Sequence, residues 1–293
     1  MPLDLELADL RGFLASRGVD WSPDGLALTY RPRGAVLPAG DDVVLVRSGA
    51  VAGRHVTDDA LLLVRGSAAT SATPDGLRLL AVDVETTGLV AGRDRVVSVG
   101  WVPVDGDTIA LAAARRFVVL GDDPGAAADI HGLTREDLAL GTPLAEVLAE
   151  LSRALEGRAL LAHHARFDVG FLRAAFREVG ERMPRGPVVC TLALQKRLLR
   201  SRGPEPWPPG ALRLWVARER FGMPAGRPHD ALGDALACAE LFLGQAAELG
   251  PVTLRDVRLR RPRPSRLRRA VRRRWWQARR RVRRTLGLSA SSR

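Results

Sequence analysis

Short apolar runs, interrupted by turn-forming residues, predict β-strands in the first quarter of the chain. Gly, Pro and Asp separate four such runs, which are Leu26–Tyr30, Val43–Val46, Val51–Val56 and Leu61–Val64. Before them, leucines recur at helical spacing over residues 1–18. After them, the Ser-, Thr- and Ala-rich residues 67–76 are typical of a linker. We therefore expect a small β-rich module with its linker at residues 1–76.

From residue 77 the pattern changes to that of an α/β domain. Three successive strands with tight turns are predicted at Leu79–Thr86, Arg95–Val104 and Thr108–Val119. Helices and short strands then alternate, with helices predicted at Leu144–Leu155, Phe167–Val179, Leu192–Leu199, Leu212–Phe221 and Ala231–Leu249, and strands at Ala159–Ala162 and Val188–Cys190. This order predicts a mixed sheet flanked by helices over residues 77–250.

Composition narrows the class of protein. A chain of 293 residues with 46% hydrophobic content has room for one substantial domain and appendages. It contains no run of 18 apolar residues, so we expect no membrane span. The acidic start of the chain does not resemble a signal peptide, and Cys190 and Cys238 are too far apart in sequence for a metal-binding motif. A reduced, cytoplasmic protein is the natural expectation.

Charge is concentrated at the C-terminal end. Residues 255–293 hold 17 Arg and one acidic residue, whereas the remainder has 28 basic and 32 acidic residues. Apolar residues recur every three or four positions from Ser265 to Leu286, so residues 251–293 form an Arg-rich tail with an amphipathic helical pattern. Nucleic-acid backbone is its first candidate partner. An anionic membrane surface is the second, because Trp275 and Trp276 suit an interface, and a solvated tail without a partner is the third.

Two acids interrupt the apolar strand predicted at residues 79–86. Side chains alternate along a strand, so Asp83 and Glu85 share one face while Val82 and Val84 face a core. Neighbouring carboxylates at the end of a buried strand repel each other unless a cation lies between them. The pair alone is weak evidence of a site, so its meaning depends on acidic partners elsewhere in the chain.

Two later clusters supply candidate partners. Asp168 follows a short strand and falls in the first turn of the next helix, where α/β folds place sites, although an acid there also stabilises the helix dipole. In the second cluster, Pro228 keeps the preceding residue out of helical geometry. His229 therefore lies outside the helix and is free to move, and Asp234 faces inward one turn later.

Together the three clusters resemble a known family. D-x-E at 83–85, H-x-A-x-F-D at 163–168 and H-D-A-x-x-D at 229–234 are similar to the motifs of DEDD-type 3′–5′ exonucleases of the histidine subfamily. That family includes the proofreading epsilon subunit of bacterial replicative polymerase, ribonuclease T and oligoribonuclease. Ile130–Thr134 also matches, and the likeness runs from Leu79 to Leu249, which implies a ribonuclease H-like fold. One departure is His164, where the family usually has Asn.

The resemblance implies a metal-dependent nuclease. It assigns Asp83, Glu85, Asp168 and Asp234 as ligands of two divalent cations, Mg²⁺ or Mn²⁺, which prefer oxygen donors. His229 would take the proton from the attacking water, and the product would be a nucleoside 5′-monophosphate. The implied substrate contacts are Thr86, Thr87 and Gly88 to the 3′-hydroxyl, Leu89 as a wedge between bases, His131 to the terminal phosphate, and His164.

Several alternatives remain open at this stage. Single-stranded DNA ends, in proofreading or repair, are the leading expectation. A DNA polymerase is a candidate partner, which the sequence itself does not reveal. A short-RNA exonuclease is the rival, since no feature of the sequence reads a 2′-hydroxyl. A catalytically silent nucleic-acid-binding module is the third reading, which the presence of all five active residues disfavours.

A second, looser resemblance concerns the N-terminal module. Residues 30–51 are similar to the first strands of a cyclic-nucleotide-binding β-roll. The segment that holds the cyclic phosphate in that family is not recognisable here. The resemblance therefore implies a degenerate docking module without nucleotide binding.

Overall fold

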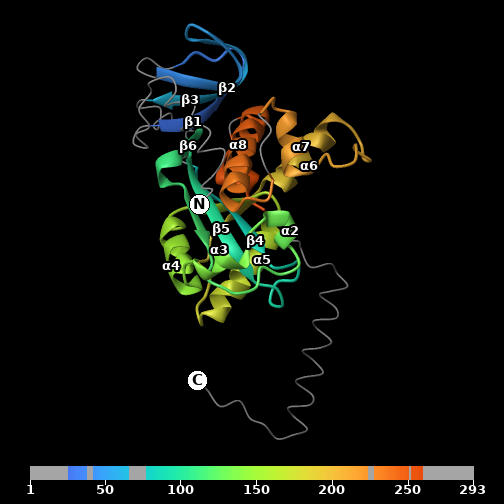
Figure 1. Ribbon diagram of the computed structural model, residues 1–293. Coiled ribbons are helices and arrows are strands. Elements are labelled where there is room, and N and C mark those ends of the chain that lie inside the picture. Colours follow the sequence, from blue (N-terminus) through green and yellow to red (C-terminus); the bar gives the residue numbers. More distant parts are fainter. Residues whose placement is uncertain (1–25, 38–41, 66–76, 224–227, 251, 260–293) are drawn as a thin grey trace, which may run out of the picture. The chain divides into compact units, whose positions relative to one another are not determined.

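The computed structural model describes residues 26–37, 42–65, 77–223, 228–250 and 252–259 (Figure 1). Three sequence predictions lie outside these residues. They are the helix in residues 1–18, the linker at 67–76 and the amphipathic helix at 265–286.

Within the described residues, nine strands form one mixed sheet in the order β2-β3-β1-β6-β5-β4-β8-β9, with β7 also pairing with β5. Only the pairs β4–β8 and β8–β9 are parallel. The predicted mixed sheet is therefore confirmed. The strands are β1 (Leu26–Arg31), β2 (Asp42–Ala52), β3 (His55–Arg65), β4 (Arg78–Thr86), β5 (Val96–Asp105), β6 (Thr108–Ala110), β7 (Arg115–Val118), β8 (Ala159–Ala162) and β9 (Val188–Cys190).

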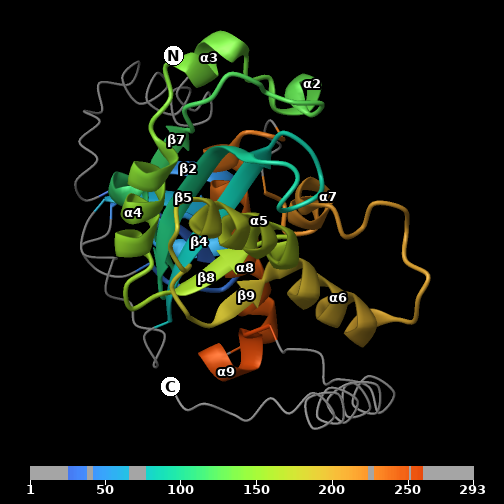
Figure 2. The same ribbon diagram turned by 90° about the horizontal axis from the view of Figure 1, so that it is seen from below.

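Helices cover both faces of this sheet, as Figure 2 shows for α4 and α5 on one side and α8 on the other. Leu80 and Val82 of β4 pack with α4 and α5, whereas Leu79 and Ala81 pack with α8. Alternate side chains of β4 therefore pack into two hydrophobic cores, one on each face of the sheet. The helices are α2 (Ala128–His131), α3 (Arg135–Ala139), α4 (Leu144–Ala154), α5 (Ala165–Glu178), α6 (Thr191–Arg202), α7 (Leu214–Glu219), α8 (Ala231–Leu249) and α9 (Leu254–Val257).

Several predicted elements were wrong in extent. The strands expected at Val43–Val46 and Leu61–Val64 are parts of the longer β2 and β3. The strand expected at Val51–Val56 contains the turn of the β2–β3 hairpin, because Gly53 has a positive φ of 59° there. The strand expected at Thr108–Val119 is broken by a 3₁₀ turn at Leu111–Ala113, so that β6 and β7 pair with different parts of β5. Helix α7 is shorter than the predicted Leu212–Phe221.

The N-terminal strands continue the sheet. β1 pairs with β3 on one side and with β6 on the other, and an ion pair between Arg31 and Asp107 accompanies the second pairing. At the opposite edge, Arg258 bridges to Val189, and the Leu259 amide donates to the Val188 carbonyl at 2.5 Å. The domain boundaries at residues 76 and 250, and the cyclic-nucleotide-binding likeness, stay predictions.

A close approach of helix and strand fixes where α8 begins. Gly100 of β5 lies directly opposite Asp83 of β4. A Cβ at Gly100 would stand 2.3 Å from the backbone of Ala231 and Leu232, which no side chain can tolerate. Glycine at this position therefore lets the first turn of α8 rest on the sheet beside Asp83.

Replacing Gly100 by Ala should force α8 away from β5. Because the colliding atoms are backbone and cannot rotate aside, we expect a loss of about 1–3 kcal/mol in the free energy of unfolding. Urea denaturation measures it. The matched control is Gly203→Ala, at an extended φ of 170° with no atom within 4 Å, which should change stability by less than about 0.5 kcal/mol. Equal effects of the two variants would contradict the role of Gly100.

Candidate active site

Four carboxylates from three elements meet at the end of β4. Asp83 and Glu85 lie on the face of β4 that α8 covers, and both are partly buried. Asp168 comes from the first turn of α5 and is 3% exposed, while Asp234 comes from the first turn of α8 and is 8% exposed. The three sequence clusters therefore converge at one place.

Burial and mutual repulsion raise the pKa of every member of this group. Desolvation is the main cause in each case, and the neighbouring carboxylates add to it. The pKa of Glu85 rises to about 8, that of Asp168 to about 7 and that of Asp234 to about 6, and the pKa of Asp83 is well above its usual range. The folded chain thus holds these acids in a form that is costly to ionise.

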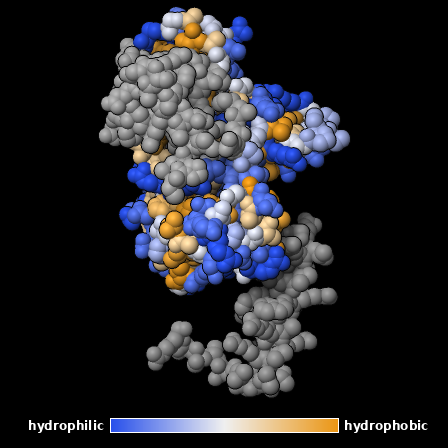
Figure 3. Space-filling model, viewed as in Figure 1, coloured by the Kyte–Doolittle hydropathy of each residue, from blue (hydrophilic) through white to orange (hydrophobic). Residues whose placement is uncertain are grey.

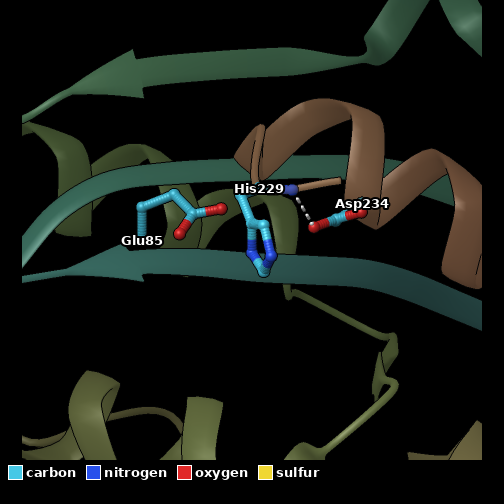
Figure 4. A group of neighbouring side chains, drawn as sticks. All are labelled: Glu85, His229 and Asp234. Carbon is cyan, nitrogen blue, oxygen red and sulfur yellow. Dashed lines mark hydrogen bonds between the residues drawn. The ribbon is translucent and has the colours of Figure 1, made fainter. Parts of the chain in front are cut away.

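His229 lies against the same cluster, between Glu85 and Asp234 (Figure 4). Its backbone has a left-handed φ of 70°, and its amide donates to Asp234 Oδ2 at 2.8 Å. The three side chains each offer one ligand atom, and these atoms all lie within 4.8 Å of one another. The ring is exposed and outside the helix, as the sequence predicted.

An ion pair holds the chain immediately after His229. Asp230 Oδ1 lies 2.9 Å from Nε of Arg116, which comes from β7 and is largely buried. The other oxygen of Asp230 accepts from the Gly233 amide at 2.8 Å and so caps α8. The positive charge of Arg116 partly offsets the rise in the pKa of Glu85, so this charge acts within the carboxylate cluster.

These residues fit divalent cations of the kind that prefer oxygen. Oδ1 of Asp234 is buried and has no hydrogen-bond partner among the described residues. The surrounding carboxylates repel one another, and a bound cation would remove that repulsion. The donors are carboxylate oxygens and one imidazole, without a thiolate, which suits Mg²⁺ or Mn²⁺.

The turn after β4 is held rigid by its own hydrogen bonds. Thr86 Oγ1 donates to the Gly88 carbonyl at 2.6 Å. The Thr87 amide donates to the Arg95 carbonyl, and Oγ1 of Thr87 accepts from the Arg95 amide, both at 2.9 Å. A Cβ at Gly88 would meet the Asp94 carboxylate at 2.6 Å, so only glycine fits without a shift. The backbone predicted to bind a 3′-hydroxyl is thus preformed next to Glu85.

Leu89 follows this turn and is 79% exposed. Apolar residues reach the surface elsewhere too, and Figure 3 shows some of them around α2 and α4 on a mostly hydrophilic face. Exposure alone therefore does not mark a wedge. The position of Leu89 directly beyond the carboxylate-bearing strand is what singles it out.

The three remaining histidines of the motifs lie in different surroundings. His131 ends α2, is largely buried and is close enough to His229 for their charges to interact. Its Nδ1 accepts from the Leu133 amide at 3.1 Å, so the neutral ring carries its proton on Nε2. His164 is exposed at the N-cap of α5 and stacks on Phe167. His163 donates from Nε2 to the Leu212 carbonyl at 2.8 Å, and burial lowers its pKa to about 4, so it is structural.

Comparison with known proteins identifies the family. The model of the RNase T family, described as exonuclease, matches residues 80–242, more than half of the chain. The chain belongs to this exonuclease family. It is thus a member of a family of 3′–5′ exonuclease enzymes.

Relatives of this exonuclease include polymerase subunits. One from Treponema pallidum, named DNA polymerase III subunit epsilon, is 31% identical over 55% of this chain and 73% of its own length. Another, from Rhodobacter capsulatus and named DNA polymerase III subunit epsilon-like protein, is 33% identical over 65% of this chain. The matched region spans only 27% of that second protein.

A solved structure confirms the fold of the exonuclease. The nuclease domain of 3′hExo, described as a DEDDh family member bound to rAMP, aligns with a TM-score of 0.51 at 14% identity, over 61% of this chain and 96% of that one. Separately, no helix in the part of the chain that the structure describes is long and apolar enough to span a membrane.

Sequence reasoning missed two features of this exonuclease site. Arg116 gave no signal, because it sits in a strand among other charged residues and its partner is 114 positions away. Asp230 was visible as part of a motif, and its place before an apolar helix could have marked it as an N-cap.

Metal-free protein should lose stability as pH rises. Each clustered carboxyl has a folded-state pKa above its usual value. Its contribution to the free energy of unfolding is therefore fully present below the unfolded pKa of about 4 and is lost as pH rises to about 8. We expect a decrease on the order of a few kcal/mol across that window in EDTA, measured by urea denaturation. Mn²⁺ should reverse the decrease.

The matched variants are Glu85→Gln, which should flatten the pH dependence, and Glu136→Gln at an exposed position, which should not. Stability that rises between pH 4 and 8 in EDTA would show that the carboxylates are not held as described.

Proposed function

We propose that this protein is a metal-dependent 3′–5′ exonuclease that releases nucleoside 5′-monophosphates from single-stranded DNA ends. The convergence of four carboxylates and His229 at the end of β4 supports the proposal most directly. The names of the relatives, polymerase III epsilon and epsilon-like proteins, favour DNA over RNA and a role in proofreading or repair.

Asp83, Glu85, Asp168 and Asp234 would hold two divalent cations, Mg²⁺ or Mn²⁺. When bound, such ions would make water easier to deprotonate and would stabilise negative charge on the leaving oxygen. The unpartnered Asp234 oxygen and the raised pKa values of the cluster support this ligand set. The protein itself contributes the fixed oxygen positions, because α5 and α8 both pack against β4.

His229 is the proposed general base. Its ring lies beside Glu85 and Asp234 yet remains exposed, so it can accept a proton from water and release it to solvent. The hydrogen bond from its own amide to Asp234 ties the base to a metal ligand. A small change in the left-handed backbone at this residue would move the ring without moving α8.

The preformed turn at Thr86, Thr87 and Gly88 is proposed to bind the terminal 3′-hydroxyl. Leu89 would separate the last two bases, and His131 and His164 would contact the strand. His131 is largely buried and close enough to His229 for their charges to interact, which suits a contact with the terminal phosphate.

We further propose that the Arg116–Asp230 pair positions His229. The amide of His229 is fixed by Asp234, and the next residue is fixed by Arg116, so the histidine is held from both sides. Arg116 is not itself proposed as a catalytic residue: it holds Asp230, and its charge also acts on Glu85. The Arg-rich residues 255–293 are proposed to add affinity for the nucleic-acid backbone, and a polymerase partner stays a proposal.

His229→Asn should reduce release of mononucleotides from a single-stranded DNA oligomer by about 10²- to 10⁴-fold in Mn²⁺. Asn tolerates a left-handed backbone, so the loop and metal binding should be kept. Mn²⁺-induced stabilisation should therefore match that of the wild type. His55→Ala, which changes an exposed histidine on β3, is the control and should be fully active.

Cleavage of an RNA oligomer of the same sequence, measured with and without EDTA, tests whether DNA or RNA is the preferred substrate. Faster cleavage of RNA would overturn the assignment of DNA, and no Mn²⁺-dependent cleavage of either strand would overturn the proposed function itself.

Arg116→Gln and Asp230→Asn should each lower kcat roughly 10- to 100-fold with KM unchanged, because a misplaced base slows only the chemical step. Asn still caps a helix, so the second variant removes charge without removing the cap. The double variant should lose no more than either single one. Multiplying effects, or a wild-type kcat for Asp230→Asn, would show that the pair does not act as a unit.

A further inference from the structure

A groove of about 440 Å³ lies beside the carboxylate cluster and has no role in the chemistry above. Residues from the start of α5, the start of α6 and the loop between α6 and α7 line it, namely His163, His164, Leu192, Trp207, Pro208, Gly210, Ala211, Leu212 and Arg213. Its lining is mostly apolar, with an aromatic ring, an exposed histidine and an exposed arginine at its margins.

A buried histidine fixes the shape of the groove. Nε2 of His163 donates to the Leu212 carbonyl, and its Nδ1 accepts from Oγ1 of Thr191 at 2.9 Å. The first contact ties the α6–α7 loop to the start of α5, and the second ties α6 to the same point. The walls are therefore held together by hydrogen bonds, and the groove is preformed.

Each wall of the groove is formed by residues that are close in sequence to a catalytic carboxylate or to a residue near one. On one side, His164 stacks on Phe167 with their planes 11° apart, and Asp168 is the next residue. On the other side, Arg213 directly precedes α7, whose Trp215 lies close enough to Asp234 to lower its pKa. A strand with its 3′ end at the carboxylates could thus continue into the groove, between the residues that precede α5 and those that precede α7.

The chemistry of the groove suits one part of a nucleic acid. Trp207 presents an aromatic surface, and its indole Nε1 is buried without a hydrogen-bond partner among the described residues. Arg200 lies 5.8 Å from the centre of that ring, and the exposed Arg213 has no ion-pair partner in the described part of the chain. An apolar slot with an aromatic wall and cationic margins matches an unpaired base with phosphates on either side.

We propose that this groove binds a base of the substrate strand upstream of the terminal nucleotide, by stacking on Trp207. The proposal rests on the proposed nuclease function and adds a second subsite to it. The groove contains none of the residues of the turn after β4, so it would not hold the terminal nucleotide itself. Stacking tolerates any base, so the subsite would favour single strands over duplexes without reading sequence.

The test compares a long and a minimal substrate. Trp207→Ala should raise KM for a single-stranded DNA oligomer roughly 5- to 100-fold, with little change in kcat. The p-nitrophenyl ester of thymidine 5′-monophosphate reaches only the carboxylates, so its kcat/KM should not change. Binding of the oligomer in EDTA, measured by fluorescence anisotropy, should weaken by the same factor as KM rises.

Two variants control for a structural effect. Trp207→Phe keeps an aromatic face and should restore most of the affinity, and Leu140→Ala, at an exposed apolar position outside the groove, should behave as the wild type. An unchanged KM for Trp207→Ala would overturn the subsite. Equal losses on the oligomer and the small ester would also overturn it, since they would indicate a disturbed active site. Wild-type protein that cleaves neither substrate would instead refute the proposed function.

Discussion

The repulsion among four buried carboxylates is the constraint around which this structure is arranged. Asp83 and Glu85 are brought together by strand alternation, but Asp168 and Asp234 reach them only because α5 and α8 begin at the same end of β4. Each of these helices places its acid in the first turn, where the helix dipole favours negative charge. That benefit does not offset burial, because the pKa values stay raised, and the remaining cost is what a bound cation would relieve.

The packing follows from this constraint. Gly100 stands opposite Asp83 and lets the backbone of α8 touch the sheet, which sets how far Asp234 lies from the strand acids. A side chain at that position would separate the cluster as well as loosen the core. Buried Leu80 and Val82 on the opposite face fix the other side of β4 against α4 and α5. The strand therefore cannot rotate to relieve the repulsion.

The sequence predicted the parts of the fold in which periodicity is strong and local. The strands at 159–162 and 188–190 and the helix at Ala231–Leu249 have the bounds that the sequence indicated. The sequence predicted the wrong strand extent where pairing with distant strands determines the structure. Residues 108–119 are apolar enough for one strand, yet Leu111 is buried in a 3₁₀ turn so that the two halves can pair separately with β5. Among the proposed site residues, those within motifs could be predicted, whereas Arg116 and Trp207 could not, because their proposed roles depend on neighbours that only the fold supplies.

The site divides into a rigid part and an adjustable part, and the division follows from burial. The carboxylates of α5 and α8 lie under packed helices and cannot shift without moving the core. His229 is exposed, has a left-handed backbone and is held by two polar contacts, from its own amide and through Asp230. Those contacts lie outside the hydrophobic clusters, so they can change strength without cost to the fold. The proposed general base can therefore shift through contacts such as the Arg116–Asp230 pair while the proposed metal ligands stay in place.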